Sequence, residues 1–362
     1  MVRGRSQERP RRTGAATSLD VARLAGVSQT TVSLVLNDAS RKVGLSEATQ
    51  QRVREAALQL GYTPNSVARN LRRRRTNTLT FICPDLSNPY FAEVMGAAQR
   101  AAQEKGYLLD ILAAQDAADK LRAVARMRSG VSDGVITSAP TQAIWEELKS
   151  LTRQGFPCVT LQDQGEDASI PCVGVDLEAG GHMATRHLLD CGYRRIGHVC
   201  AHQSHPLRRQ ERVHGYRRAL LEAGLEHRPA WEIEVPNSPE GGVEAVGRLL
   251  TLPSPRPEAL FVFNDQMAIG VLHALRRHGL RVPEDMAVVG FDGIALTGFG
   301  NPTLTTVEHP RQELGRQAAI SLIERLEGVE RPEPHSLLPG RLLIRESCGG
   351  LKRSGLLEGV AA

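Results

Sequence analysis

Several features that would place this chain in a membrane or outside the cell are absent from its 362 residues. No apolar run reaches the roughly eighteen residues that a membrane-spanning helix needs. The first residues, Met1–Arg5, lead into further charge instead of the apolar stretch of a secretory signal. Aromatic residues make up 4% of the chain and charged residues 23%, a composition typical of globular proteins. We therefore expect a globular, cytoplasmic protein.

Motifs for metal binding and catalysis are equally scarce. The six cysteines form no C-x-x-C pair, and we recognise no histidine clustered with them at metal-binding spacing. Several lie in apolar, strand-like runs, so we interpret them as buried structural thiols in a reducing compartment and expect no metal site. The motif H-E-x-x-H and the P-loop are also absent. We expect no catalytic residue and no cofactor; an enzyme with the same fold is the alternative, which an activity screen would reveal.

Positive charge is concentrated at the start of the chain. Residues 1–75 hold 15 Lys/Arg and 5 Asp/Glu, whereas the remainder holds 30 and 35. A basic module on a near-neutral body is typical of a protein that binds nucleic acid. A solvated, disordered arm explains residues 1–17, but it does not explain the patterned stretch that follows.

Residues 18–63 have the pattern of a helix-turn-helix domain. Ala22 is small where two helices would cross, and Gly26 supplies the positive φ that a tight turn requires. The expected helices are Leu19–Ala25 with Ser18 as N-cap, Gln29–Leu36 with Ser28 as N-cap, and a third helix between Ser46 and Gly61.

The second of these helices has an outward polar face that suits a major groove. Its apolar residues face the other helices, so the polar residues of its early turns remain outside. The residues predicted to reach base edges are Gln29, Thr30, Ser33 and Leu34, and those predicted to contact phosphates are Ser28, Thr31 and Asn37. The alternatives are a generic three-helix bundle and a headpiece that binds a protein.

From Leu79 onward, apolar runs of strand length alternate with amphipathic helices such as Pro89–Lys105 and Gln266–His278. This alternation predicts parallel sheets covered by helices on both faces, and roughly ten strands favour two lobes. The expected strands are Leu79–Cys83, Leu108–Leu112, Gly134–Thr137, Cys158–Leu161, Val173–Asp176, Ile196–Cys200, Ile233–Val235, Leu260–Phe263 and Ala287–Phe291.

With these motifs the chain resembles the lactose-repressor/galactose-repressor (LacI/GalR) family of bacterial transcription regulators. The resemblance runs from Leu19 to about Ser347 and rests on separate blocks in the family's order. These blocks are Asp20–Ser33, Leu60–Arg69, Pro84–Phe91, Gly192–Ile196, Asn264–Ala268 and Val288–Asp292.

The resemblance implies an all-α helix-turn-helix headpiece and an α/β two-lobed periplasmic-binding-protein-like domain with two Rossmann-like parallel sheets. The domains are then a basic arm (1–17), the helix-turn-helix domain (18–63), a hinge helix and linker (64–76), an effector-binding and dimerisation domain (77–350) and a flexible tail (351–362). Within the body, the first lobe spans about 77–176 and 308–339, and the second about 177–307 and 340–350, joined by three crossovers.

In this family the hinge becomes helical only on DNA, in a dimer. Leu71 matches the leucine that the family inserts between base pairs through the minor groove, where an apolar wedge bends the duplex. Asn65 is a candidate cap for the hinge helix, and Ala68 matches a minor-groove contact. Leu71 as an ordinary linker residue is the alternative, and Arg72–Arg75 are either phosphate contacts or a solvated charge run.

In such sheets ligands bind beyond the carboxyl ends of the strands. Carboxylates and amides there suit hydrogen bonds to sugar hydroxyls, and an aromatic ring suits stacking on a sugar. The candidate effector-binding residues at these ends are Ser87, Tyr90, Phe91, Asn264, Asp265 and Asp292, and the resemblance adds Arg212. Asp265 as a helix cap and Asp292 as a turn residue are the alternatives.

The chain departs from the family pattern at three places. Leu34 stands where many relatives carry arginine, Gly293 where relatives usually have a second aspartate, and the tail has no heptad run for a tetramer. The expected function is a repressor that binds a pseudo-palindromic operator in double-stranded DNA as a homodimer, nucleoid-associated when bound. A small-molecule effector, a sugar or glycoside, would relieve repression or act as a corepressor.

Overall fold

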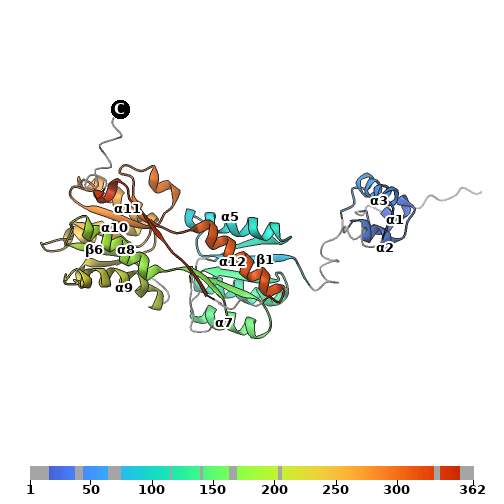
Figure 1. Ribbon diagram of the computed structural model, residues 1–362, viewed down its shortest axis with the longest axis horizontal. Coiled ribbons are helices and arrows are strands. Elements are labelled where there is room, and N and C mark those ends of the chain that lie inside the picture. Colours follow the sequence, from blue (N-terminus) through green and yellow to red (C-terminus); the bar gives the residue numbers. More distant parts are fainter. Residues whose placement is uncertain are drawn as a thin grey trace, which may run out of the picture. The chain divides into compact units, whose positions relative to one another are not determined.

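The computed structural model describes residues 16–36, 44–63, 75–114, 116–138, 142–162, 169–202, 206–329 and 335–350. The chain divides into two compact units, Met1–Arg74 and Arg75–Ala362 (Figure 1). No helix in these described ranges is long and apolar enough to cross a membrane. Most of the predicted basic arm, nearly all of the hinge and linker, and the predicted tail lie outside the described residues.

In the described part of the first unit, the headpiece, three helices surround a valine-rich core. Its helices are α1 (Ser18–Ala25), α2 (Gln29–Leu36) and α3 (Glu47–Gln59). Val21, Val32, Val35 and Val53 are at most 1% exposed, and Val27 and Leu36 pack against them. Gly26 ends α1 with a φ of 64°, so the glycine turn predicted from the sequence is confirmed.

The start of α1 differs from the prediction. Thr17 is the N-cap and Ser18 is the first helical residue. The Thr17 hydroxyl accepts a hydrogen bond from the Asp20 amide at 3.3 Å, and the Asp20 carboxylate accepts one from the Thr17 amide at 2.9 Å. Such a capping box satisfies two amides, whereas Ser18 alone would satisfy one. The caps at Ser28 and Ser46 are confirmed, with the Thr31 and Thr49 amides at 3.1 and 3.4 Å.

The second unit, the body, holds two six-stranded sheets. In the first sheet the order is β11 (His335–Leu338), β5 (Cys172–Val175), β4 (Cys158–Leu161), β3 (Gly134–Ser138), β1 (Thr78–Cys83) and β2 (Leu108–Ala113). In the second it is β12 (Arg341–Leu343), β10 (Thr305–Glu308), β9 (Ala287–Asp292), β8 (Ala259–Val262), β6 (Ile196–Ala201) and β7 (Glu232–Val235). Neighbouring strands are parallel except for β10 and β12, which are antiparallel.

Helices pack in pairs on both faces of each sheet, as parallel sheets require. The first sheet is covered by α5 (Pro89–Glu104) with α12 (Arg311–Leu326), and by α6 (Ala117–Arg126) with α7 (Gln142–Arg153). The second is covered by α8 (Leu177–Asp190) with α9 (Pro206–Glu222), and by α10 (Pro239–Thr251) with α11 (Asp265–Arg277). Each face therefore has its own apolar core.

The nine predicted strands are present with ends that differ by at most one residue, and the sequence reading missed β10, β11 and β12. These three short strands lie next to crossovers between the lobes. The chain crosses at Asp176 between β5 and α8, at His309–Pro310 between β10 and α12, and at Pro339–Gly340 between β11 and β12. The two-lobed architecture with three crossovers is thus confirmed.

Helices α5 and α12 cross in backbone contact at Gly315, and this contact predicts a stability effect. A Cβ there would lie 2.0 Å from the Val94 carbonyl oxygen and 3.0 Å from the Ala98 nitrogen. Gly315→Ala should lower the free energy of unfolding of the body by about 1–3 kcal/mol, because the helices must move apart. The matched control is Gly247→Ala on α10, where a Cβ meets nothing within 4 Å.

The control substitution should be neutral or stabilise by up to about 1 kcal/mol, since alanine is the better helix former. Denaturant unfolding of the full chain measures both. Equal effects of the two substitutions would contradict a backbone contact at this crossing.

Candidate functional site

The candidate DNA-binding face lies on α2. Gln29, Thr30 and Ser33 are exposed and Leu34 is half-buried. The Ser28 hydroxyl caps the helix and lies 2.9 Å from the Thr31 hydroxyl. Hydroxyls and amides at a helix N-terminus can contact base edges and phosphates. Four other predicted DNA contacts, Asn37, Asn65, Ala68 and Leu71, lie outside the described residues.

The structure adds a contact that the sequence reading missed. The Gln29 side-chain amide donates a hydrogen bond to the Ser18 hydroxyl at 2.8 Å. Ser18 begins α1 and Gln29 begins α2, so this bond connects the N-terminal turns of the two helices. A glutamine held in this way presents its carbonyl oxygen with less rotational freedom.

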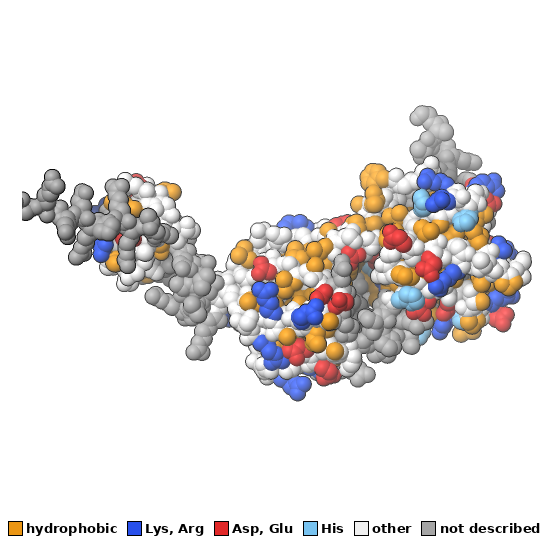
Figure 2. Space-filling view, turned by 180° about the vertical axis from the view of Figure 1, so that it is seen from behind, with side chains coloured by type: hydrophobic (Ala, Val, Ile, Leu, Met, Phe, Trp, Pro, Cys, Tyr) orange, Lys and Arg blue, Asp and Glu red, His pale blue; other side chains and the backbone are white. Residues whose placement is uncertain are grey.

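Charge on the body is mixed. Figure 2 shows basic and acidic side chains interspersed over the visible face of the body. Arg75, the described member of the Arg72–Arg75 run, donates a hydrogen bond to the Leu326 carbonyl at the end of α12, at 2.7 Å. This contact ties Arg75 to the body and to the negative end of a helix dipole.

The candidate effector site in the body includes Arg212 on α9, which is 8% exposed. Its guanidinium carbon lies 4.2 Å from the centre of the Phe263 ring and 4.3 Å from that of Phe291. Two aromatic faces therefore orient one planar cation. The sequence reading missed both phenylalanines, because the three residues are far apart in the chain.

Asp292, the last residue of β9, is 6% exposed and has a φ of 112°. Few residues other than glycine adopt such a φ, so surrounding contacts must hold the backbone here. Burial raises the pKa of Asp292 to about 8, although the charges of Arg212 and Arg311 oppose the rise. At neutral pH the protonated carboxyl can both donate and accept a hydrogen bond, which suits a hydroxylated ligand.

Asp265 and Asn264 are engaged within the second lobe. The Asp265 carboxylate accepts hydrogen bonds from the Thr306 hydroxyl at 2.7 Å and the Ile294 amide at 2.8 Å. Asn264 caps α11 through the Met267 amide and donates to Asn237 at 2.8 Å. Burial raises the pKa of Asp265 to about 7. Asp265 fixes the loop after Asp292 and Asn264 fixes the start of α11, so the polar atoms of both residues are already used by the protein.

The first lobe contributes the start of α5. Ser87 is exposed, and its hydroxyl donates to Asp85 at 2.6 Å. Tyr90 is 4% exposed, its hydroxyl is hydrogen-bonded by Gln162, and its ring meets that of Phe91 edge-on at 5.2 Å. The structure therefore places Tyr90 and Phe91 together and leaves Ser87 at the surface turn.

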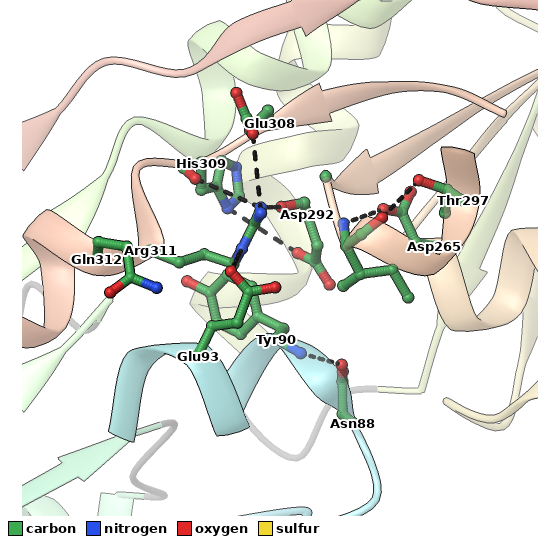
Figure 3. Close-up of polar contacts among 12 residues, drawn as sticks. Asn88, Tyr90, Glu93, Asp265, Asp292, Thr297, Glu308, His309, Arg311 and Gln312 are labelled. Carbon is green, nitrogen blue, oxygen red and sulfur yellow. Dashed lines mark hydrogen bonds and ion pairs between the residues drawn. The ribbon is translucent and has the colours of Figure 1, made fainter. Parts of the chain in front are cut away.

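Arg311, which the sequence reading missed, joins the lobes beside Asp292 (Figure 3). Its Nε donates to Glu93 on α5 at 2.9 Å, and its Nη1 donates to the Asp292 carbonyl at 2.6 Å. His309, 2% exposed, lies between the rings of Tyr90 and Phe291, at 6.0 and 4.6 Å. Burial, and then Arg212 and Arg311, hold the pKa of His309 well below its usual value. His309 is therefore neutral and lies among Arg212, Arg311 and Asp292 without adding a charge.

The structure explains why residue 293 is a glycine. Its φ is 72°, and a Cβ on it would lie 2.6 Å from the Glu308 Cα. A second aspartate at this position would clash with the end of β10. The same crossover region borders a cavity of about 480 Å³ whose lining includes Glu93, Glu308 and Arg311, but none of the predicted effector residues.

Comparisons with known proteins agree with this architecture. Residues 17–65 match the model of bacterial regulatory proteins of the lacI family, and residues 185–348 match a periplasmic binding protein-like domain. The HTH-type transcriptional repressor PurR of Haemophilus influenzae (strain PittEE) is 37% identical over 339 residues, which cover 92% of this chain and 98% of PurR. The chain belongs to the LacI family.

Solved structures of LacI-family regulators match over the same length. The lac repressor dimer bound to operator and the anti-inducer ONPF has a TM-score of 0.81 at 26% identity, with 92% of this chain and 99% of that chain covered. The complex of the transcriptional regulator CelR with cellobiose has a TM-score of 0.69 at 31% identity, with the same coverage of 92% and 99%. As a LacI-family member, this chain is a DNA-binding transcriptional repressor.

Because Gln29 lies on the exposed face of α2, we expect its substitution to weaken sequence-specific binding to the operator. Gln29→Ala should weaken binding to the preferred operator by about 1–3 kcal/mol and relax one base position in each half-site. Ser18→Ala is the matched control, because it removes the intramolecular partner and leaves the amide. Fluorescence anisotropy on operator and on random DNA measures both. If Gln29→Ala lowered specific and random binding by one factor, the residue would have only a structural role.

The raised pKa values of Asp265 and Asp292 predict that the body loses stability as the pH rises. Each group binds its proton more tightly in the folded state, so its contribution is present below pH 4 and is lost as the pH rises to about 7 or 8. Asp292→Asn should reduce the loss between pH 6 and pH 8.5 by about 1–3 kcal/mol.

Asp285→Asn is the control for this pH dependence. The hydrogen bond from Arg281 lowers the pKa of Asp285 to about 2, so this residue does not titrate between pH 6 and pH 8.5. Unfolding midpoints of the body at the two pH values measure the difference. A slope that Asp292→Asn leaves unchanged would show that this carboxyl is ionised throughout.

Proposed function

We propose that this LacI-family repressor is controlled by a sugar or glycoside that binds between the lobes at Arg212 and Asp292. The position of these two residues beside the crossovers carries the proposal. Arg212 lies against Phe291 at the end of β9, and Asp292 is the next residue. A guanidinium and a carboxyl at one strand end suit paired hydrogen bonds to neighbouring hydroxyls. The cellobiose bound to the related CelR supports this class of effector.

Arg311 supplies a way for the effector to act on the arrangement of the lobes. Its guanidinium bonds both the Asp292 carbonyl and Glu93 on α5. A ligand held by Asp292 and touching Tyr90 would favour one distance between these elements over another. A ligand can shift the equilibrium only by its difference in affinity for the two arrangements.

In this mechanism, the hinge between the headpiece and the body controls the affinity for operator DNA. In a dimer on a pseudo-palindromic operator, the spacing of the two first lobes would set whether Leu71 and its mate reach the minor groove together. The lac repressor dimer solved on its operator supports this assembly. Ligand binding in the body would then fold or unfold the hinge helices that carry Leu71 in both subunits at once. A single binding event would therefore change operator affinity. The role of the chain is regulation and not catalysis.

The test begins with the operator. Sequencing the DNA fragments that the purified protein retains identifies it, and calorimetry then titrates candidate ligands into free and operator-bound protein. Cellobiose and ribose represent sugars, and a nucleobase represents planar ligands without hydroxyls. By reciprocity, operator DNA must change ligand affinity by the factor by which the ligand changes operator affinity. Equal ligand affinity in both titrations would contradict the coupling.

Three substitutions separate the two ends of the mechanism. Arg212→Ala should abolish the ligand response and leave operator affinity without ligand nearly intact. Leu71→Ala should retain ligand binding and lose most operator affinity and bending. Arg218→Ala is the matched control on α9, because this arginine lies at the surface and pairs with Glu178. A ligand response that survives Arg212→Ala would place the effector elsewhere.

A further inference from the structure

Three potential metal ligands meet in the second lobe, away from the effector site. His187 and Cys191 lie four residues apart at the C-terminal end of α8, and Cys348 lies in the short helical turn Glu346–Cys348. The His187 Nε2 is 3.1 Å from the Cys348 Sγ and 3.7 Å from the Cys191 Sγ, and all three atoms lie within 4.8 Å of one another. The two cysteines are buried and free of disulfides.

We propose that His187, Cys191 and Cys348 bind a zinc ion that fastens the last turn of the body to α8. Two thiolates and one imidazole are ligands that zinc prefers, and water would complete a tetrahedron. With Zn–S near 2.3 Å and Zn–N near 2.0 Å, a tetrahedral ion would place nitrogen and sulfur about 3.5 Å apart and the two sulfurs about 3.8 Å apart. The two observed nitrogen–sulfur distances are 3.1 and 3.7 Å, so small side-chain movements would bring them to this value.

The surroundings of Cys348 differ from those of other buried cysteines in the chain. The Cys83 and Cys200 thiols lie within hydrogen-bonding distance of backbone carbonyl oxygens, to which only a protonated thiol can donate. Cys348 has such a contact as well, with the Arg345 carbonyl oxygen at 3.6 Å, but its Sγ also lies 3.1 Å from the Thr305 hydroxyl and 3.3 Å from the Gly350 amide, which can donate to it. Such donors stabilise a thiolate, the form that binds metal.

Both cysteines would bind zinc as thiolates, so any thiol proton would be released to solvent on binding. The reaction needs no oxidant or reductant.

Gly350 leaves the donor atoms uncrowded. A Cβ at this position would lie 3.2 Å from the Cys348 Sγ and 3.3 Å from the His187 Nε2. Both distances are tighter than ordinary van der Waals contact. A methyl group at residue 350 would therefore push on two of the three donors, Cys348 and His187.

The site connects elements that are distant in the chain. The neighbouring Ser347 hydroxyl donates to the Val288 carbonyl on β9 at 2.6 Å and accepts from the Thr305 amide on β10 at 2.9 Å. Zinc would add a bond from this turn to α8. An ion that binds only the folded state raises stability by mass action, so the second lobe should unfold at a higher temperature with zinc bound.

The test uses the reduced full-length protein, stripped of metal and titrated with cobalt(II), then with zinc against a competing chelator. Wild-type protein should bind one equivalent of cobalt with thiolate charge-transfer and tetrahedral absorption bands, and zinc should displace it. Thermal unfolding of the same samples should shift upward with zinc. The absence of the thiolate band at one equivalent of cobalt would overturn the proposal. A disulfide between Cys191 and Cys348 that persists after treatment with the reductant would do so as well.

Substitutions assign the site. Cys191→Ala should weaken zinc binding by at least about 100-fold, and Gly350→Ala, which keeps all three ligands, by about 10–100-fold. Cys200→Ala is the matched control, a buried cysteine of the same lobe, and should bind zinc as wild type does. Circular dichroism and operator binding without metal check that each variant is folded. Equal zinc affinity in Cys191→Ala and Cys200→Ala would show adventitious binding.

Discussion

The guanidinium of Arg311 is the contact on which the arrangement of the body depends. It is 8% exposed and reaches from the start of α12 to Glu93 in one lobe and to the Asp292 carbonyl in the other. The second bond holds Asp292 at a φ that side chains rarely adopt, and so aims its carboxyl. One residue therefore sets both the junction of the lobes and the geometry of the candidate effector site.

The junction between the lobes contains several buried ionisable side chains, and their free energy depends on how they are paired. Arg212, Asp265, Asp292 and Arg311 are all nearly excluded from water, where an isolated charge is strongly unfavourable. Protonation of the aspartates and pairing of the arginines offset much of this penalty. Because the balance depends on which groups are paired, a ligand that supplied hydrogen bonds at Asp292, as we propose, would change the relative free energies of two lobe arrangements.

Helix α8 connects the two ends of the second lobe. It begins directly after the crossover at Asp176 and ends at Asp190, next to Cys191 and close to Cys348. It packs closely on α9, which carries Arg212, and a Cβ on Gly181 would lie 2.4 Å from the Arg212 carbonyl oxygen. A rigid α8 therefore supports the backbone of Arg212, and the proposed zinc ion would stiffen the opposite end of the same helix.

Local pattern by itself determined the headpiece helices, nine strands, the caps at Ser28 and Ser46 and the turn at Gly26, because caps and hydrophobic period act within a few residues. The family came from separate motifs that resemble those of known members. Only the tertiary structure decided which polar groups are already satisfied: Asp265 by Thr306 and Ile294, and Gln29 by Ser18. It also placed Arg311 between the lobes and brought His187 and Cys191 to Cys348. The sequence reading overlooked that His187 and Cys191 are four residues apart, one turn of a helix. Their third partner depends on how distant strands and crossovers pack, and no local pattern encodes that distance.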